Sequence, residues 1–178
     1  MADQDLLNSG NGSGEANEGP QAATLAQYIK DLSIENPNSP QVYQWQEQPR
    51  VDVQFNIDVA RVSDEVHEVV IKLEVSARSD SGVQFLVELS YAGLFGLRNF
   101  PEEAMGAFLL VEAPRLLFPF ARQIIAEAVS STGFPPLLLD PIDFTAAYMA
   151  QLQAQQGQQQ QGEGGAGGQE PSETPSQA

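Results

Sequence analysis

The chain has 178 residues, with 24 Asp and Glu against eight Lys and Arg, a net charge of −16 and no cysteine. The basic residues are scattered singly, which argues against nucleic acid and anionic membrane surfaces as partners, because both attract clustered Lys and Arg. Without cysteine, neither disulfides nor thiol chemistry is available. No apolar run approaches the ~20 residues of a membrane span, and the first residues lack the features of a signal peptide. We therefore expect a cytoplasmic protein with no direct membrane insertion.

Composition divides the chain into three parts. Residues 1–23 and the Gln/Gly-rich residues 153–178 are polar and low in complexity. Such segments bury too little apolar area to offset the entropy of ordering, so we expect two disordered tails. Residues 24–152 form one domain, which is long enough to bury about two-thirds of its unfolded surface.

Alternation of apolar and polar residues predicts antiparallel strands with one wet face. The three clearest segments are residues 51–59, 65–78 and 83–91. The sequence Ser79–Gly82 predicts the hairpin turn between the last two.

Residues 24–35 predict a weaker first strand. Its alternation places Tyr28, Leu32 and Ile34 toward the core, and Asp31, Ser33 and Glu35 outward. Residues 36–49, with three prolines, are too long for a tight hairpin and should cross an edge or end of the sheet.

The most apolar part of the chain lies between residues 116 and 148. Before it, residues 92–100 are expected to be an apolar loop and residues 102–111 a helix, while the long helix should be regular from about Pro119 to Ser131. A helix that is apolar nearly all round must be covered on more than one face, so a sheet can cover one face and a second subunit the other. The side chains expected at this oligomer interface are Leu117, Phe120, Ile124, Ile125 and Ala128.

The sequence Asp140–Pro141–Ile142–Asp143 predicts the start of the last helix, with an N-cap, a proline at the first position and an acid in the first turn. The predicted fold class is α+β: a four-stranded antiparallel sheet with a long crossover loop, followed by two helices packed on one face. The other face of the sheet is expected to stay wet and acidic.

No residue pattern predicts catalysis, a metal site or a cofactor. His67 is the single histidine, and it lies on the inward register at a strand start, where packing is the expected role. Asp140 and Asp143 have the spacing of a helix cap rather than of a catalytic pair. We therefore expect a protein that is not an enzyme.

Two surfaces are candidates for binding. The outward sheet face carries acids around one apolar residue, which is typical of a modest protein-binding patch: Asp31, Glu35, Glu74, Leu86 and Glu88. The second candidate is a set of aromatic residues that either belong to the core or line a groove for extended peptide: Tyr43, Trp45, Phe134, Phe144 and Tyr148.

Several motifs in order resemble the protein-export chaperone family SecB, over about residues 28–152. The motifs are Asp31–Pro40 (DLSIENPNSP), Gly93–Phe95, Phe118–Arg122 (FPFAR), Gly133–Leu137 (GFPPL) and Pro141–Phe144 (PIDF). The resemblance implies a cytoplasmic homotetramer, a dimer of dimers, that binds unfolded precursor proteins without ATP. It also implies that the chaperone delivers these precursors to the translocase motor SecA.

The resemblance also implies roles for individual residues. Contact with SecA carries over to Asp31, Glu35, Leu86 and Glu88, and the client groove to Tyr43, Phe144 and Tyr148. Three alternatives remain open: a SecB-like chaperone that guards another client such as an antitoxin, an oligomer that binds a small apolar ligand in the aromatic groove, and, more remotely, an enzyme.

Overall fold

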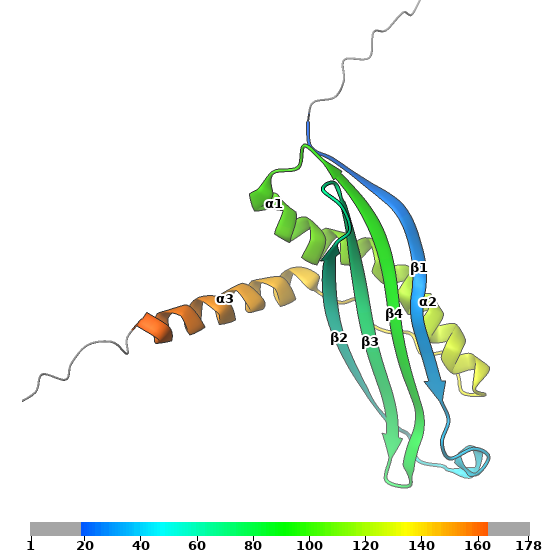
Figure 1. Cartoon of the computed structure of the whole chain (residues 1–178). Helices are drawn as coiled ribbons and strands as arrows, with labels where there is room; N and C mark the ends of the chain where they lie inside the picture. Colours follow the sequence, from blue (N-terminus) through cyan, green and yellow to red (C-terminus); the bar gives the residue numbers. More distant parts are fainter. Residues whose placement is uncertain (1–18, 164–178) are drawn as a thin grey trace, which may run out of the picture.

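A computed structural model gives the structure of residues 19–163, with only the course of the backbone for residues 156–163. Four strands form one antiparallel sheet in the order β1-β4-β3-β2 (Figure 1). The strands are β1 (Gln21–Glu35), β2 (Arg50–Arg61), β3 (Val66–Ser79) and β4 (Gly82–Arg98), with a short 3-10 turn, η1 (Gln41–Gln44), between the first two. The helical segments are α1 (Glu102–Ala107), the π-helical turn η2 (Phe108–Glu112), α2 (Ala113–Ser131) and α3 (Phe144–Glu163). The predicted α+β class is confirmed.

The loop of residues 36–49 joins strands at opposite edges of the sheet, so it passes the end of the β3–β4 hairpin. It is tied there on both sides of η1. Asn38 Nδ2 donates a hydrogen bond to the carbonyl of Val83 over 2.9 Å, and Glu47 Oε2 accepts one from the backbone N–H of Ser81 over 3.1 Å. The predicted crossing at the sheet end is therefore confirmed.

The prediction of an apolar loop over residues 92–100 is wrong, because β4 continues to Arg98. The alternation carries on through Gly93, Phe95 and Leu97, all of which are buried. This extension pairs with β1 on one side and with β3 on the other. The two glycines that suggested a loop have no side chain, and at Gly93 this lets helix α2 approach the strand closely: a Cβ there would lie 2.7 Å from Leu117 Cδ2.

The prediction that Tyr28 faces the core is also wrong. Ile29 pairs with Tyr91 and Asp31 pairs with Ser90, so Lys30 is an extra residue in β1 and forms a β-bulge. A bulge shifts the alternation by one residue. Leu32 and Ile34 therefore keep their predicted inward side, whereas Tyr28, on the other side of the bulge, points outward.

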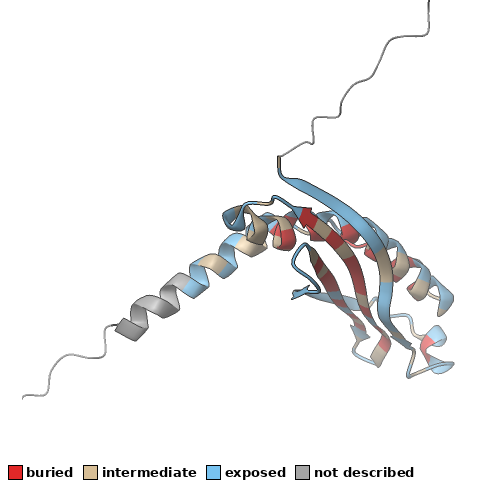
Figure 2. Cartoon of the chain, turned by 45° about the horizontal axis from the view of Figure 1, so that its top comes forward, coloured by how far each residue is buried: buried red, intermediate tan, exposed pale blue. Residues whose placement is uncertain are grey.

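Residues 102–131 form one continuous helical segment, with η2 between α1 and α2. The prediction that the long helix becomes regular only at about Pro119 is wrong: α2 is regular from Ala113, and the π-turn η2 lies before it. The segment of 30 residues is long and apolar enough to cross a membrane by length and composition alone, contrary to the sequence-based expectation. In this structure, however, α2 packs on the inner face of β4 and β3 and buries eight side chains there (Figure 2).

The core lies between α2 and the central strands, while the inner faces of the two edge strands stay partly open (Figure 2). The apolar residues that the chain leaves exposed on these edges include Ile29, Leu32 and Ile34 on β1, and Val51, Val53, Phe55 and Val59 on β2. A single chain therefore covers the middle of its sheet but not its borders.

The last helix begins three residues later than predicted, and its N-cap is Asp143 rather than Asp140. Asp143 Oδ1 accepts a hydrogen bond from the backbone N–H of Ala146 over 2.9 Å, which is the bond of a capping residue. Asp140 stays outside the helix, because a proline follows it and a proline disfavours helix in the residue before it. Helix α3 then leaves the sheet and projects to one side (Figure 1), so the prediction that both helices pack on one face holds for α2 but, beyond Phe144 at its start, not for α3.

The bounds of the domain differ slightly from the predicted residues 24–152. Strand β1 begins at Gln21 and helix α3 continues to Glu163. Most of the two predicted tails, residues 1–18 and 164–178, lies outside the described residues, and their disorder stays a prediction.

Candidate functional site

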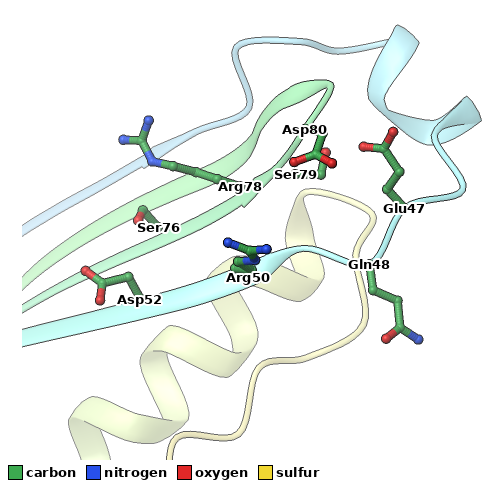
Figure 3. Close-up of a pocket in the computed structure, with 8 residues that line it drawn as sticks. All are labelled: Glu47, Gln48, Arg50, Asp52, Ser76, Arg78, Ser79 and Asp80. Carbon is green, nitrogen blue, oxygen red and sulfur yellow. The ribbon is translucent and has the colours of Figure 1, made fainter.

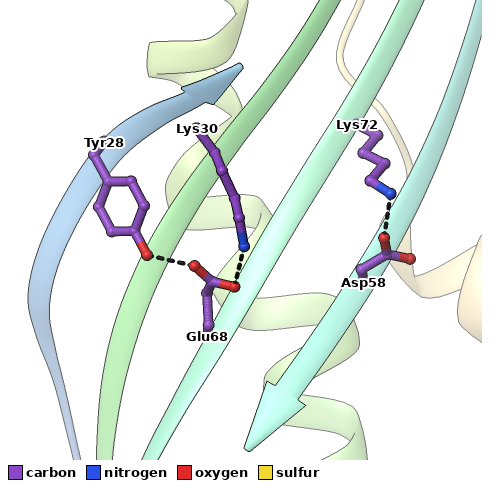
Figure 4. Close-up of polar contacts among 5 residues, drawn as sticks. All are labelled: Tyr28, Lys30, Asp58, Glu68 and Lys72. Carbon is purple, nitrogen blue, oxygen red and sulfur yellow. Dashed lines mark hydrogen bonds and ion pairs between the residues drawn. The ribbon is translucent and has the colours of Figure 1, made fainter. Parts of the chain in front are cut away.

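The outward face of the sheet has two halves of different character. In the half farther from the β3–β4 hairpin, charges are paired. Lys30 Nζ lies 2.6 Å from Glu68 Oε2, and Tyr28 donates a hydrogen bond to the other oxygen of Glu68 (Figure 4). Lys72 Nζ lies 2.6 Å from Asp58 Oδ2 on the neighbouring strand. This half is therefore not simply acidic, as the sequence pattern had indicated.

These contacts shift the pKa values of the groups involved. The ammonium of Lys30, followed by the hydroxyl of Tyr28, lowers the pKa of Glu68. The same hydrogen bond raises the pKa of Tyr28, because it would bring two negative charges together if Tyr28 ionised. Lys72 lowers the pKa of Asp58, and Asp58 in turn raises the pKa of Lys72. These shifts keep Glu68, Asp58 and Lys72 charged at neutral pH.

The other half of the outward face, toward the β3–β4 hairpin, carries acids without cationic partners. Glu74 on β3 is the cross-strand partner of Glu88 on β4, and like charges in this position repel. We define the acidic patch by its residues: Asp31, Glu35, Asp52, Glu74, Leu86 and Glu88; of these, Asp31 lies at the border with the paired half, in a hollow that Lys30 and Lys72 also line. Among the described residues none of its carboxylates forms an ion pair.

The structure brings the four predicted motor-contact residues onto this one face. Asp31, Glu35 and Glu88 are exposed, and Leu86 is half-buried. Leu86 pairs with Glu35 on one side and with Ser76 on the other, so it lies in the middle of the sheet with Glu88 two residues along β4. Asp52, which had not been singled out from the sequence, belongs to the same surface because it pairs with Ser76. Its even position in the alternation of residues 51–59 was the available signal.

A hollow of about 410 Å³ continues this surface toward the hairpin (Figure 3). Its lining comes from β2, β3, the hairpin and the crossover loop: Glu47, Gln48, Arg50, Asp52, Ser76, Arg78, Ser79 and Asp80. Hydrogen bonding, chiefly from the backbone N–H of Ser81, lowers the pKa of Glu47. Arg50 and Arg78 are cross-strand partners, so the hollow holds a pair of opposed cations. Sequence reasoning missed this pair, since the two residues lie 28 positions apart on strands whose register only the fold fixes.

The predicted aromatic residues form two separate groups rather than one. In the first, the rings of Tyr43 and Phe134 lie 5.7 Å apart, and Phe134 also contacts Phe85 at 5.3 Å. The hydroxyl of Tyr43 donates to the carbonyl of Thr132 over 2.6 Å, which ties the crossover loop to the end of α2. Trp45 lies nearby against the hairpin, where a Cβ on Gly82 would stand 3.3 Å from its ring.

The second group is at the start of α3. Phe144 is only 2% exposed and packs edge-on against Phe55 and Phe118, each at 5.9 Å. It therefore belongs to the core of this chain and offers no ring surface to a client in this conformation. Tyr148, one turn along, is half-buried and lies beside Gly106 on α1.

Helix α2 divides the five predicted interface residues. Leu117 and Ile125 are fully buried against the chain's own sheet, so neither has surface left for a partner. Phe120 is 48% exposed, and Ile124 and Ala128 are half-buried. Leu116, which the prediction omitted, is 50% exposed one turn before Phe120. The i, i+4 spacing of Leu116 and Phe120 could have identified it.

His67 is 6% exposed and packs in the sheet beside Phe95, in keeping with the packing role expected for it. Within residues 19–163, no three His, Cys, Asp or Glu side chains are grouped so as to hold a metal ion. The described residues thus offer binding surfaces: an acidic patch, an aromatic cluster and exposed apolar strips.

Comparisons with known proteins agree with this picture. The family model of the preprotein translocase subunit SecB matches residues 15–155. The protein-export protein SecB of Sphingopyxis alaskensis is 55% identical over 138 residues, which are 78% of this chain and 80% of that protein. The corresponding protein of Zymomonas mobilis is 56% identical over 136 residues, covering 76% and 83%.

A solved structure shows the same fold. It is the SecB-like chaperone of Mycobacterium tuberculosis in complex with a peptide from an antitoxin, with a TM-score of 0.57 at 16% sequence identity, covering 68% of this chain and 90% of that one. The family model and the two relatives carry the assignment, because each spans more than three-quarters of this chain. The chain belongs to the SecB family of protein-export chaperones.

Proposed function

We propose that this protein is an ATP-independent holdase of the cytoplasm, which keeps precursor proteins unfolded and delivers them to the SecA motor as a homotetramer. The observation that carries the proposal is the match of residues 15–155 to the SecB family. The separation of an acidic outward face from aromatic and apolar surfaces elsewhere supports it, because a delivering chaperone needs one surface for the client and another for the motor.

The assembly is supported by apolar surface that one chain cannot cover. The inner border of β1 exposes Ile29, Leu32 and Ile34 by 37–47%, and α2 exposes Leu116 and Phe120. Phe120 stacks on Tyr91 of the central strand, so helix and sheet present their apolar residues together. Exposed apolar surface of this kind marks an interface. A second copy that covers it would give the dimer from which a dimer of dimers is built.

Client binding is assigned to the aromatic cluster of Tyr43, Trp45 and Phe134, together with Tyr148. Tyr43 is 51% exposed although its hydroxyl is hydrogen-bonded, so the ring is held in place with one face free. Each apolar side chain captured there contributes about 1–3 kcal/mol, which is weak for a single site. Several such sites on one oligomer, engaged by one long chain, raise the overall affinity through effective concentration. The client must be unfolded to reach them all, so slow folders are selected.

Motor binding is assigned to the acidic patch. Its carboxylates have no cationic partner among the described residues, and Leu86 supplies an apolar contact in their midst. A basic surface on SecA would complement it, and charge complementarity of this kind speeds association and weakens with salt. Release of the client then follows from delivery to the motor rather than from nucleotide hydrolysis by this chain.

The refolding of a slow-folding precursor tests the holdase activity. Denatured precursor is diluted into buffer with and without a stoichiometric amount of the protein, and the recovery of native precursor is followed in the absence of nucleotide. We expect refolding to slow in proportion to the added protein. The same precursor, once folded, should not be bound. Unchanged refolding at excess protein would reject the holdase function.

A further inference from the structure

We propose that Arg50 and Arg78 together bind a carboxylate side chain of the SecA surface that docks on the acidic patch. This proposal rests on the proposed function, since it specifies the partner of the same face. The docking surface of SecA then carries an acidic residue beside its basic residues, rather than positive charge alone.

The first observation is that these two arginines are left unpaired. All eight Lys and Arg residues lie within residues 19–163. Five of them form ion pairs, namely Lys30, Arg61, Lys72, Arg98 and Arg115. Arg122 is half-buried on α2, away from this face. Among the described residues, no ion pair joins Arg50 or Arg78 to a carboxylate, although the chain has three times as many acids as bases.

The second observation is their placement. Arg50 on β2 and Arg78 on β3 are direct cross-strand partners on the outward face, and both side chains are exposed. Cross-strand partners have Cβ atoms about 5 Å apart, and two like charges there destabilise the sheet. The fold gains nothing from this pair. Two exposed arginines that line the same hollow can, however, both reach a carboxylate placed in it through charge-assisted hydrogen bonds.

The third observation is continuity with the acidic patch. Arg78 lines the hollow of Figure 3, and it also lines the adjoining hollow that contains Glu74, Leu86 and Glu88. Four residues along β3 separate Arg78 from Glu74, which corresponds to about 13 Å of strand. The outward face thus presents an opposed pair of cations and an opposed pair of acids at a fixed spacing. A partner with the reverse arrangement fits it in one orientation only.

A carboxylate fits this hollow better than a phosphate group does. Glu47, Asp52 and Asp80 also line the hollow. These three acids outnumber the two arginines, so the lining has a net negative formal charge, which opposes a doubly charged phosphate about twice as strongly as a singly charged carboxylate. We therefore assign the two arginines to an acidic side chain of the motor rather than to a free anion.

The direction in which SecA affinity changes when the two arginines lose their charge tests the proposal. The double variant Arg50→Gln/Arg78→Gln makes the outward face more negative. If SecA responded only to negative charge, its affinity would rise. If the arginines bind a carboxylate, affinity falls, and we expect a loss of about 3- to 10-fold at fixed ionic strength, which is the scale of exposed ion pairs. An unchanged or higher affinity overturns the proposal.

Two further variants make the outcome unambiguous. Arg61→Gln/Arg98→Gln carries the same charge change at the opposite end of the sheet, and it should leave SecA affinity at or slightly above that of the parent. Glu88→Lys tests the docking face itself in the same assay. If Glu88→Lys lowers affinity while Arg50→Gln/Arg78→Gln does not, the face stands and the arginine proposal falls. If Glu88→Lys leaves affinity unchanged, the proposed docking face falls instead.

Discussion

Lys30 on the edge strand β1 reaches Glu68 on β3 across the whole width of β4, with 2.6 Å between Nζ and Oε2. The crossing is possible because the β4 residue beneath the lysine is Ala92, which is the cross-strand partner of Tyr28. The methyl group of Ala92 is too small to block the way. Ala92 itself is fully buried, although it lies on the outward face. The aliphatic stem of a lysine and the ring of Tyr28 can cover an apolar spot while their polar ends stay in water.

We expect Lys30→Met to lower stability in a pH-dependent way. Lys30 is the main cause of the lowered pKa of Glu68. A carboxylate whose pKa is lowered in the folded state stabilises the fold above its unfolded pKa of about 4.3, and this contribution is lost as the pH falls through the folded value. Because Lys30 is half exposed, the loss at neutral pH should be about 1 kcal/mol or less. Urea unfolding at neutral and acidic pH measures it.

The matched control for this variant is Arg61→Met, which removes an ion pair to the almost fully exposed Asp64. We expect its stability to equal that of the parent at both pH values. A loss in Lys30→Met that is equally large in acid, where Glu68 is protonated, would show that lost packing rather than the ion pair is responsible.

Gly93→Ala should destabilise the fold by about 1–3 kcal/mol, the usual cost of overpacking. The added Cβ would stand 2.7 Å from Leu117 Cδ2 and 2.9 Å from the ring of Phe95, both fully buried side chains. Gly96→Ala, three residues along the same strand, is the control, because its Cβ would meet only Leu25 at an ordinary 3.5 Å. Thermal unfolding compares the two. Equal melting temperatures would contradict the close packing of α2 on β4.

Leu116→Asp should reduce the assembly to a smaller species. Leu116 is 50% exposed on the face of α2 that the sheet does not cover, so a charge there costs the subunit little but would be buried by a partner. Val62→Asp places the same charge on a 60% exposed residue away from this helix and should keep the parental mass. Light scattering of both variants decides, and a parental mass for Leu116→Asp would reject this face as an interface.

Trp45→Ala combined with Tyr148→Ala should weaken client binding about 10-fold or more while the assembly stays intact, because each ring contributes roughly 1–3 kcal/mol. The affinity for a fluorescently labelled unfolded precursor measures the effect. Met149→Ala removes a 53% exposed apolar side chain from the same helix and serves as control. Loss of the assembly in the double variant would assign these rings to the core instead.

Salt should separate the two binding activities. Under the proposed docking of SecA on the acidic patch, motor affinity should fall steadily between low and physiological ionic strength. Client capture by aromatic rings should change little over the same range. Titrations with SecA and with an unfolded precursor in one salt series test this. A motor affinity that is indifferent to salt would contradict a charge-based docking face.

Strands whose residues alternate regularly between the inner and the outward face could be predicted from the sequence. Val53 and Val75 are cross-strand partners on the inner face, and their alternation was visible without any knowledge of the fold. Tyr28 was misplaced because a bulge at Lys30 resets the alternation, and nothing in the local pattern marks a single extra residue. The end of β4 was missed because glycine predicts a loop, whereas Gly93 here serves the close approach of a helix.

The candidate site was predictable only in part for a related reason. Glu88 and Asp31 could be placed on the outward face because each lies in a strand whose sides are defined by its own neighbours. Long-range relations were out of reach: that Arg50 faces Arg78, that Lys30 reaches Glu68, and that Phe144 is covered by Phe55 all depend on register and packing. Leu117 was assigned to an interface because a helix apolar on all sides does not reveal which side meets its own sheet.

The most direct test of the account is the mass of the unmodified protein in solution, alone and after mixing with a denatured, slow-folding precursor, measured by light scattering. We expect the mass of a tetramer for the protein alone and a shift to the mass of a tetramer with bound precursor, without nucleotide. A monomer, or a tetramer whose mass does not change in the presence of the unfolded precursor, would contradict it.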